Sequence, residues 1–491
     1  MNLRLLLLLI ITALLNACHP RPKHTAEVSD YPHIVPDYVG VTIPTGIAPL
    51  HFAMPEAERM EVELSGTRGE KLHSHGTYAK MDLDQWHQLL SANRGDSLTV
   101  SVTALVNGEW RRYRPFPIYV SADTLRAWGL TYRLIPPGYE SYGQMGLYER
   151  ELRSFSERPL LENSEISRGC INCHTPLPSE PETFTFHVRG PHGATVVSRK
   201  GTIEMLAPRN EALGGSMVYP YWHPTGSYIA YSTNDTHQNF YSTHSRRIEV
   251  YDNHSDILIY RPDSHQILLD SLLARPDRLE SYPTFSPDGR SLYYCTAQRQ
   301  DSIWKNYSLI RYDICRIAFH PETGRLGTSV DTLVHASRSG HSACMPRISP
   351  DGRFLLFALC DYGCFPIWHP EADLWMMDLK TDRTFPLRQA NSQDAESFHA
   401  WSPDSRWIVF TSRRTNGLYT ELYLCHVDSM GHASKAFCLP QRHPVQFMTE
   451  TPYSFNTPDF AATPLRSSSK ELRDRIMKAE RIPTELQMQQ H

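Results

Sequence analysis

The sequence of 491 residues lacks an excess of charge of either sign. Its 49 Lys and Arg residues and 53 Asp and Glu residues give a formal net charge of −4. Proteins that bind nucleic acid carry a strongly basic surface. We therefore expect no nucleic acid partner for this chain.

Long apolar runs are also missing. No segment after the first 18 residues reaches the 18 apolar residues that a membrane-spanning helix requires. The run from Leu5 to Leu15 follows Arg4 and is typical of a secretory signal. It ends in Leu15-Asn16-Ala17-Cys18, which resembles a bacterial lipobox, although Asn16 replaces the usual small residue. The alternative is a plain signal peptide with an incidental cysteine.

These features predict an exported lipoprotein that faces the periplasm, at the outer membrane. Residues 1–18 are the expected signal peptide, and Cys18 is the expected lipid anchor. Residues 19–35 are polar and proline-rich, which predicts a tether.

A hydrolase motif is absent. The segment Gly214-Gly215-Ser216-Met217-Val218 lacks the second glycine of a nucleophile elbow, and no other Gly-x-Ser-x-Gly occurs. We therefore do not expect a hydrolase.

The ten cysteines do not form a disulfide framework. Besides Cys18, Cys170 and Cys173, seven are scattered through apparent strands. One or two bridges are possible in an oxidising compartment, but their pairing cannot be deduced.

What the sequence does contain favours a mainly β fold, with 11% aromatic residues and 36 prolines. Apolar and polar residues alternate at 60–64 and 98–106, and Asn107-Gly108 predicts a hairpin turn. We expect a β-sandwich at 36–130, with a short helix near 82–90. From 131 to 182 the pattern becomes irregular, which predicts a linker.

Four segments of the second half repeat one another around an aromatic-Ser-Pro-Asp-Gly core. Their prolines are Pro224, Pro287, Pro350 and Pro403, spaced by 63, 63 and 53 residues. Ser-Pro-Asp-Gly predicts a type I turn between two strands of a propeller blade. The first copy has His223 at the serine position, and the last has Ser405 at the glycine position.

These repeats resemble the TolB-like, WD40-like β-propeller family over about residues 183–440. The resemblance implies about six blades, with a propeller at 183–460 and a C-terminal tail at 461–491. A helix is expected in that tail at 468–481. Over its whole length the chain is similar to lipoproteins of Bacteroidetes that join a β domain, a Cys-x-x-Cys-His segment and such a propeller.

Cys170-Ile171-Asn172-Cys173-His174 is the attachment pattern of a c-type haem. Both thiols would form thioethers with the porphyrin, and the adjacent His174 would be the proximal iron ligand. The pattern predicts one covalent haem c. A structural disulfide, a redox-active thiol pair and a zinc site remain as alternatives.

The sixth ligand of the iron is open at this stage. Met145, His187, His192 and Met205 are the candidates near the motif.

The leading functional hypothesis is a lipid-anchored monohaem protein. It would act in electron transfer or in redox or ligand sensing, and its propeller would dock an envelope protein partner. The first alternative is a propeller scaffold without haem, in which Cys170 and Cys173 form a disulfide. The second is an enzyme that resembles the cytochrome cd-type nitrite reductases, for which no second haem ligand stands out.

Overall fold

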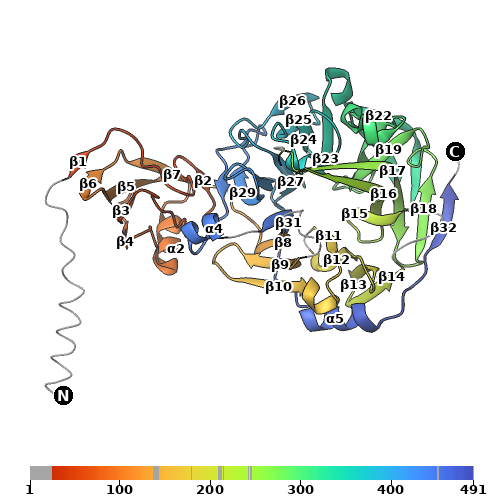
Figure 1. The fold of residues 1–491 in the computed structure, drawn as a ribbon, viewed down its shortest axis with the longest axis horizontal. Helices are drawn as coiled ribbons and strands as arrows, with labels where there is room; N and C mark the ends of the chain where they lie inside the picture. Colours follow the sequence, from red (N-terminus) through yellow and green to blue (C-terminus); the bar gives the residue numbers. More distant parts are fainter. Residues whose placement is uncertain are drawn as a thin grey trace, which may run out of the picture.

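The structure is a computed structural model that describes residues 25–136, 143–178, 180–207, 213, 215–241, 243, 246–450 and 453–489. It contains an N-terminal β domain beside a larger β-propeller (Figure 1). The expected signal peptide and Cys18 lie outside the described residues. None of the helices in the described part of the chain is long and apolar enough to cross a membrane.

The N-terminal domain is a single seven-stranded sheet with one helix. Its elements are β1 (Ala26–Glu27), β2 (Thr42–Ile43), β3 (Arg59–Gly66), β4 (Lys71–Gly76), α2 (Leu83–Ala92), β5 (Ser97–Val106), β6 (Glu109–Arg112) and β7 (Phe116–Val120). The long strand β5 pairs with β3 on one side and with both β6 and β7 on the other. Because all the strands belong to one sheet, the two-sheet sandwich is not confirmed.

The hairpin turn and the short helix predicted for this domain are both present. Asn107 and Gly108 form the turn between β5 and β6 with φ of +53° and +76°. Both values are left-handed, which is the conformation that this turn requires. Helix α2 begins after Asp82, whose carboxylate accepts hydrogen bonds from the backbone of Asp84 and Gln85.

The propeller has six blades. Five of them follow one another along the chain, each with four strands. The first two are β11 (Ile171–Leu177), β12 (Glu180–Val188), β13 (Ala194–Arg199) and β14 (Thr202–Leu206), then β15 (Ser216–Trp222), β16 (Ile229–Phe240), β17 (Ile248–Arg261) and β18 (Gln266–Asp270). The other three are β19 (Arg278–Phe285), β20 (Ser291–Gln298), β21 (Asp313–His320) and β22 (Arg325–Val334), then β23 (Ser342–Ile348), β24 (Phe354–Cys360), β25 (Asp373–Asp378) and β26 (Arg383–Pro386), and last β27 (Glu396–Trp401), β28 (Trp407–Ser412), β29 (Glu421–His426) and β30 (Phe437–Cys438). The first strand of each blade lies innermost.

The sixth blade closes the ring with strands from both ends of the propeller. It combines β8 (Gly129–Ile135), β9 (Gly146–Glu151) and β10 (Glu157–Glu162) with β31 (Ser454–Ala461), which supplies the inner strand. β31 pairs antiparallel with β8 across more than 300 residues of sequence.

Short helices and one extra strand complete the propeller. The helices are η1 (Asn163–Ile166), α3 (Ile303–Asn306), η3 (Tyr307–Leu309), η4 (Ala336–Ser339), η5 (Pro366–Trp368), α4 (Pro444–Glu450) and α5 (Ser469–Lys478). After α5 the chain runs along the outside, and β32 (Glu485–Gln489) pairs in parallel with β18 at the outer edge of its blade (Figure 1).

The repeated turns have the predicted geometry. In the second copy the Gly289 N–H donates to the Ser286 carbonyl at 2.9 Å, and the Ser286 hydroxyl donates to Asp288 at 2.5 Å. Gly289 has a φ of +69°. Ser405, which replaces glycine in the last copy, adopts the same left-handed backbone at +59°.

The prediction of an irregular linker at 131–182 is wrong. This stretch instead supplies part of β8, then β9, β10, η1 and β11 and the start of β12, in two blades of the ring. Neither of these two blades has the Ser-Pro-Asp-Gly turn, so the repeat did not reveal them. The Cys-x-x-Cys-His segment therefore lies inside the propeller.

Candidate functional site

A cavity on the axis of the propeller is lined by the inner strands of all six blades. Its volume is about 40 Å³, and its walls are formed by Cys173, His174, Thr175, Tyr219, Pro220, Tyr282, Pro283, Met345, Arg347, Phe398, His399, Thr457, Pro458 and Asp459. Two residues of the haem attachment motif thus face the centre of the ring.

A bulge in each inner strand builds this wall. In β11, Asn172 pairs with His187 and Thr175 pairs with Thr185, so two residues of β11 stand opposite one of β12. The ladders of β15, β19, β23 and β31 shift at the equivalent place. The shift in β27 lies one residue earlier, and His399 pairs with Phe410. A bulge re-aims the side chains of the extra residues, and here it aims them at the axis. Cys173 is the first bulge residue of β11, with a φ of +56°.

His174 is the second bulge residue, and its imidazole is 3% exposed. Neither ring nitrogen has a hydrogen-bond partner among the described residues. Burial lowers the pKa of His174 to about 4, so the ring is neutral at physiological pH. A buried polar group without a partner costs free energy, and a neutral imidazole with a free lone pair is a good metal ligand.

The two cysteines of the motif differ in their surroundings. Cys173 is buried and Cys170 is half-buried, and both are free thiols. Burial raises the pKa of the Cys173 thiol, although a backbone hydrogen bond from Tyr219 opposes the shift. Arg133 donates a hydrogen bond to Asn172, whose amide oxygen also accepts from the Cys173 backbone at 2.9 Å. Asn172 and Arg133 thus fix the backbone between the two thiols.

A second histidine faces the same cavity. His399 is 4% exposed, and burial lowers its pKa to about 4. Its Nδ1 lies 2.8 Å from the Ser397 carbonyl oxygen, and its Nε2 has no hydrogen-bond partner in the described structure. The sequence analysis did not single out this residue. The signal was present, because His399 stands where the preceding repeats have Pro283 and Pro346.

One cation and one carboxyl group complete the polar part of the wall. The Arg347 guanidinium donates to Thr284 at 3.0 Å and lies 4.9 Å from the centre of the Tyr221 ring. Burial raises the pKa of Asp459 to about 6, although Arg347 opposes the shift. The cavity thus holds a fixed positive charge and a carboxyl group that titrates near neutral pH.

The four candidates for the sixth ligand do not line the cavity. Met145 lies buried just before β9, and His192 lies in the turn between β12 and β13. His187 is buried on β12, and its Nδ1 contacts the Thr195 hydroxyl at 3.1 Å. Met205 is buried on β14, the outermost strand of its blade. The structure therefore does not bring these side chains to the cavity that His174 faces.

The residues fit a covalently attached haem in their chemistry. The motif supplies two free thiols, and the buried imidazole of His174 has no other partner. The cavity itself has room for about three water molecules. A porphyrin attached here must therefore displace side chains such as Tyr219 and Tyr282, whose rings stack at 4.2 Å.

Two of the alternative chemistries find no support in the geometry. No group of three or more His, Cys, Asp or Glu side chains in the described residues is arranged to hold a metal ion. A redox-active cysteine needs a lowered thiol pKa, whereas the pKa of Cys173 is raised.

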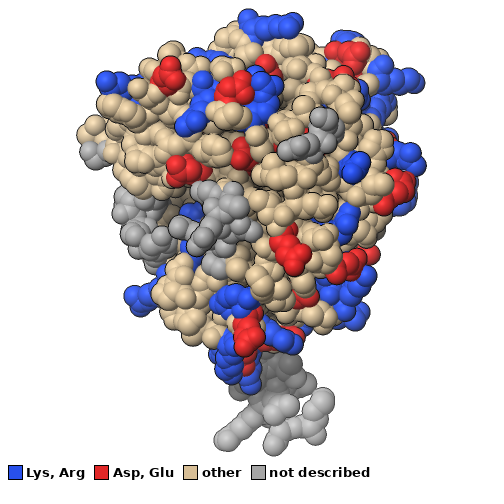
Figure 2. Space-filling view, turned by 90° about the vertical axis from the view of Figure 1, so that its right-hand side faces the viewer, with Lys and Arg blue, Asp and Glu red and all other residues tan. Residues whose placement is uncertain are grey.

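The face of the propeller in Figure 2 has no large patch of charge of one sign. There, Lys and Arg side chains alternate with Asp and Glu over the side of the propeller that lies to the right in Figure 1.

No protein-family model and no curated protein matches the chain. Solved structures similar to it include hydrazine synthase of Kuenenia stuttgartiensis, with a TM-score of 0.43 and 10% identity over 68% of this chain and 46% of that one. The periplasmic gluconolactonase PpgL of Pseudomonas aeruginosa has a TM-score of 0.34 and 13% identity over 78% and 96%. Dipeptidyl peptidase 4 of Porphyromonas gingivalis has a TM-score of 0.31 and 10% identity over 70% and 58%.

The chain spans less than half of the hydrazine synthase chain. TM-scores this low say nothing about the activity of this chain.

Proposed function

We propose that the chain is an exported monohaem c protein whose haem is bound covalently by Cys170 and Cys173 at the propeller axis. His174 would be the proximal ligand of the iron. The proposed role is electron transfer or the sensing of redox state or of a small ligand, with the propeller docking an envelope protein partner.

One observation carries this proposal. His174 is almost fully buried beside Cys173, and both of its ring nitrogens lack a partner among the described residues. A histidine kept for packing would be expected to have hydrogen bonds. His223 shows this, because its Nδ1 contacts Thr225 at 2.8 Å and its Nε2 contacts the Gly289 carbonyl at 3.0 Å. An iron atom would satisfy one nitrogen of His174.

A bound haem would supply one-electron chemistry at this place. The protein would hold the iron through His174 and surround it with the inner strands of the ring. Arg347 is the only Lys or Arg in the described cavity wall and would be available to a haem propionate. Burial inside the ring would restrict solvent, which is one of the means by which proteins set a reduction potential.

The lipid anchor belongs to the same proposal and depends on the sequence around Cys18. A labelled fatty acid fed to the producing cells should be incorporated into the wild-type chain and not into Cys18→Ala. Equal labelling of the two chains, or none in either, would remove the anchor from the proposal without affecting the haem site.

Co-expression with a haem c maturation system tests the haem directly. After denaturation the wild-type chain should retain haem in a stained gel and give the pyridine haemochrome spectrum of a c-type haem. The Cys170→Ala/Cys173→Ala variant, produced in the same host, should retain none. Haem-free wild-type protein in a host that matures a known cytochrome c would refute the proposal.

The scaffold without haem remains the second candidate, because one end of the propeller exposes large apolar side chains. Phe240 is 55% exposed, Trp304 63% and Leu309 59%. The tip of the β16–β17 hairpin and the loop that follows β20 meet here, since the Tyr241 and Tyr307 hydroxyls lie 3.4 Å apart. Exposed apolar surface of this kind is typical of a docking surface.

This candidate is tested by cross-linking in cells. Cross-links to an envelope protein that are lost in Phe240→Ser/Trp304→Ser and kept in His174→Leu would support a scaffold that works without haem. Cross-links that disappear in His174→Leu as well would tie docking to the haem site.

A further inference from the structure

The axial cavity is lined by a buried histidine that the fold leaves without hydrogen bonds. Both ring nitrogens of His174 lack a partner among the described residues. The ring is neutral at physiological pH, so it has one N–H group to donate and one lone pair to accept with. The side chains beside it in the wall include Tyr219, Met345 and Phe398, which are largely apolar. A polar molecule inside the cavity would satisfy this histidine.

Arg347 brings a positive charge to the same wall. Its Nη1 donates to the Thr284 hydroxyl at 3.0 Å and to the Pro346 carbonyl at 3.4 Å. Its Nη2 and Nε donate to no group in the described structure, and no carboxylate lies within 4.0 Å of the guanidinium there. The guanidinium thus has only neutral partners and one edge with two parallel, unused N–H donors. This edge is the one that binds an oxyanion through two oxygens.

The charge of the wall depends on pH through one carboxyl group. Asp459 is the only carboxylic acid among the described wall residues, and burial raises its pKa to about 6. The other titratable side chains of the wall are uncharged near this pH, namely Cys173, His174, Tyr219, Tyr282 and His399. Below the pKa of Asp459 the wall therefore has one net positive charge, from Arg347. This charge favours an anion in the cavity.

The volume of the cavity limits the size of that anion. A volume of about 40 Å³ has room for about three water molecules, and therefore for a ligand of roughly three or four non-hydrogen atoms. Formate and acetate have this size, and both are planar oxyanions with one negative charge. A ligand confined to so small a space lies close to both Arg347 and His174.

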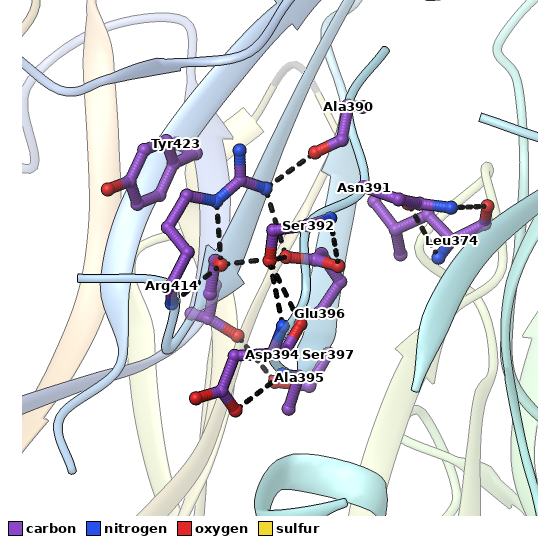
Figure 3. A network of polar contacts seen from close by, with 12 residues as sticks. Leu374, Ala390, Asn391, Ser392, Asp394, Ala395, Glu396, Ser397, Arg414 and Tyr423 are labelled. Carbon is purple, nitrogen blue, oxygen red and sulfur yellow. Dashed lines mark hydrogen bonds and ion pairs between the residues drawn. The ribbon is translucent and has the colours of Figure 1, made fainter. Parts of the chain in front are cut away.

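The wall is held in shape on the β27 side by a polar network (Figure 3). Glu396, at the start of β27, accepts hydrogen bonds from the hydroxyls of Ser392 and Ser412 at 2.6 and 2.8 Å. Its carboxylate also pairs at 2.9 Å with Arg414, whose guanidinium lies 4.4 Å from the centre of the Tyr423 ring. The network ties β27 to β28 and limits the movement of the strand. A wall that is fixed before binding loses less entropy when a ligand enters.

We propose that the axial cavity of the haem-free chain binds a planar oxyanion of one negative charge and of the size of formate or acetate. Arg347 holds two of its oxygens through the Nε and Nη2 edge, and His174 donates its N–H group to one of them. This goes beyond the proposed function and concerns the chain without haem, because a porphyrin would take up the same space.

Isothermal titration calorimetry of the chain, produced without a haem c maturation system, tests the proposal with formate, acetate, acetamide and benzoate. Acetamide has the shape of acetate without its charge, and benzoate is too large for the cavity. We expect formate and acetate to bind at one site, and the other two compounds not to bind. Formate should bind on the order of tenfold more tightly at about pH 5.5 than at about pH 7.5, because Asp459 loses its charge at the lower pH.

Variants of the wall locate the site. Arg347→Gln should lose formate binding, and Arg347→Lys, which keeps the charge without the two parallel donors, should weaken it by on the order of tenfold. His174→Leu should weaken it as well. Arg325→Gln removes an exposed arginine of the outer strand β22 and should bind formate like wild type. Thermal melts show whether each variant is folded, and Arg347→Lys carries the test if Arg347→Gln does not fold.

Three results would overturn the proposal. They are heats that do not saturate with formate or acetate, acetamide that binds as tightly as acetate, and folded Arg347 variants that bind formate like wild type. None of them bears on covalent haem, which is tested in protein from a maturation-competent host. Haem-free wild type from such a host would refute the proposed function and leave the formate result unchanged.

Discussion

His174 and His399 both line the axial cavity, from the inner strands of two blades that are separated by one other blade. Neither nitrogen of the His174 ring has a hydrogen-bond partner in the described structure, whereas the Nδ1 of His399 lies 2.8 Å from the Ser397 carbonyl oxygen. The unpaired nitrogens of the His174 ring cost the fold free energy, and this cost can be measured.

The haem-free protein should become more stable when His174 is replaced by an apolar side chain of similar size. His174→Leu removes two buried nitrogens that have no partner, and we expect a gain on the order of 1 kcal/mol in the free energy of unfolding. Urea denaturation of protein made without the haem maturation system measures it.

His223→Leu is the matched control for this prediction. Both ring nitrogens of His223 have partners, so its replacement should destabilise the chain by about 1 kcal/mol or more. Equal losses in the two variants would mean that His174 is an ordinary packing residue.

A buried carboxyl group on β19 should make stability depend on pH. Burial raises the pKa of Glu280 to about 8, and the nearby Asp256 carboxylate raises it further. The folded state therefore holds a proton that the unfolded state releases above its ordinary pKa. Stability is then greatest below the unfolded pKa and is lost as the pH rises through the folded one.

Glu280→Gln keeps the neutral form at every pH. We expect it to melt like wild type near about pH 4 and to be more stable by on the order of 3 kcal/mol near about pH 9. Thermal melts across this range measure the difference. A wild-type advantage at alkaline pH would contradict the assignment.

The network around Glu396 should be sensitive to the loss of one partner. Glu396→Ala leaves the mostly buried Arg414 without its carboxylate, and we expect a loss of about 3 kcal/mol. Asp277→Asn breaks an ion pair with Arg275 in which both side chains are about half exposed, and it should leave the melting temperature unchanged. Comparable losses in both variants would show that the Figure 3 network has no special role.

The two C-terminal strands should differ in importance. A chain that ends at residue 452 lacks β31, which leaves the closing blade without its inner strand, and it should fail to unfold cooperatively. A chain that ends at Pro483 lacks only β32, whose side chains are largely exposed, and it should lose a few degrees of melting temperature. Circular dichroism melts of the two truncated chains test this difference. Cooperative unfolding of the chain that ends at residue 452 would contradict the closure of the ring by β31.

The sequence predicted those parts of the fold that depend on local signals. The Ser-Pro-Asp-Gly turns and the Asn107-Gly108 hairpin each combine a turn geometry with residues that suit it. The closing blade could not be read in this way, because β31 and β8 meet only in three dimensions. For the same reason, β11 was taken for part of a linker.

The site was found in part from the sequence. Cys170, Cys173 and His174 form a pattern of five consecutive residues, which is visible without a structure. His399 is 225 residues away from His174, and its relation to the motif depends on the ring that brings β11 and β27 to one cavity. The four residues expected as a sixth ligand were chosen for their nearness in sequence, and the propeller directs them elsewhere.

The central claim is that Cys170 and Cys173 hold a haem, and the intact mass of the denatured protein tests it most directly. Wild type and Cys170→Ala/Cys173→Ala are produced side by side with a haem c maturation system. We predict that wild type exceeds the variant by the mass of one haem, beyond the change expected from the two substitutions. Masses that differ by the substitutions alone, in a host that matures a known cytochrome c, would contradict the claim.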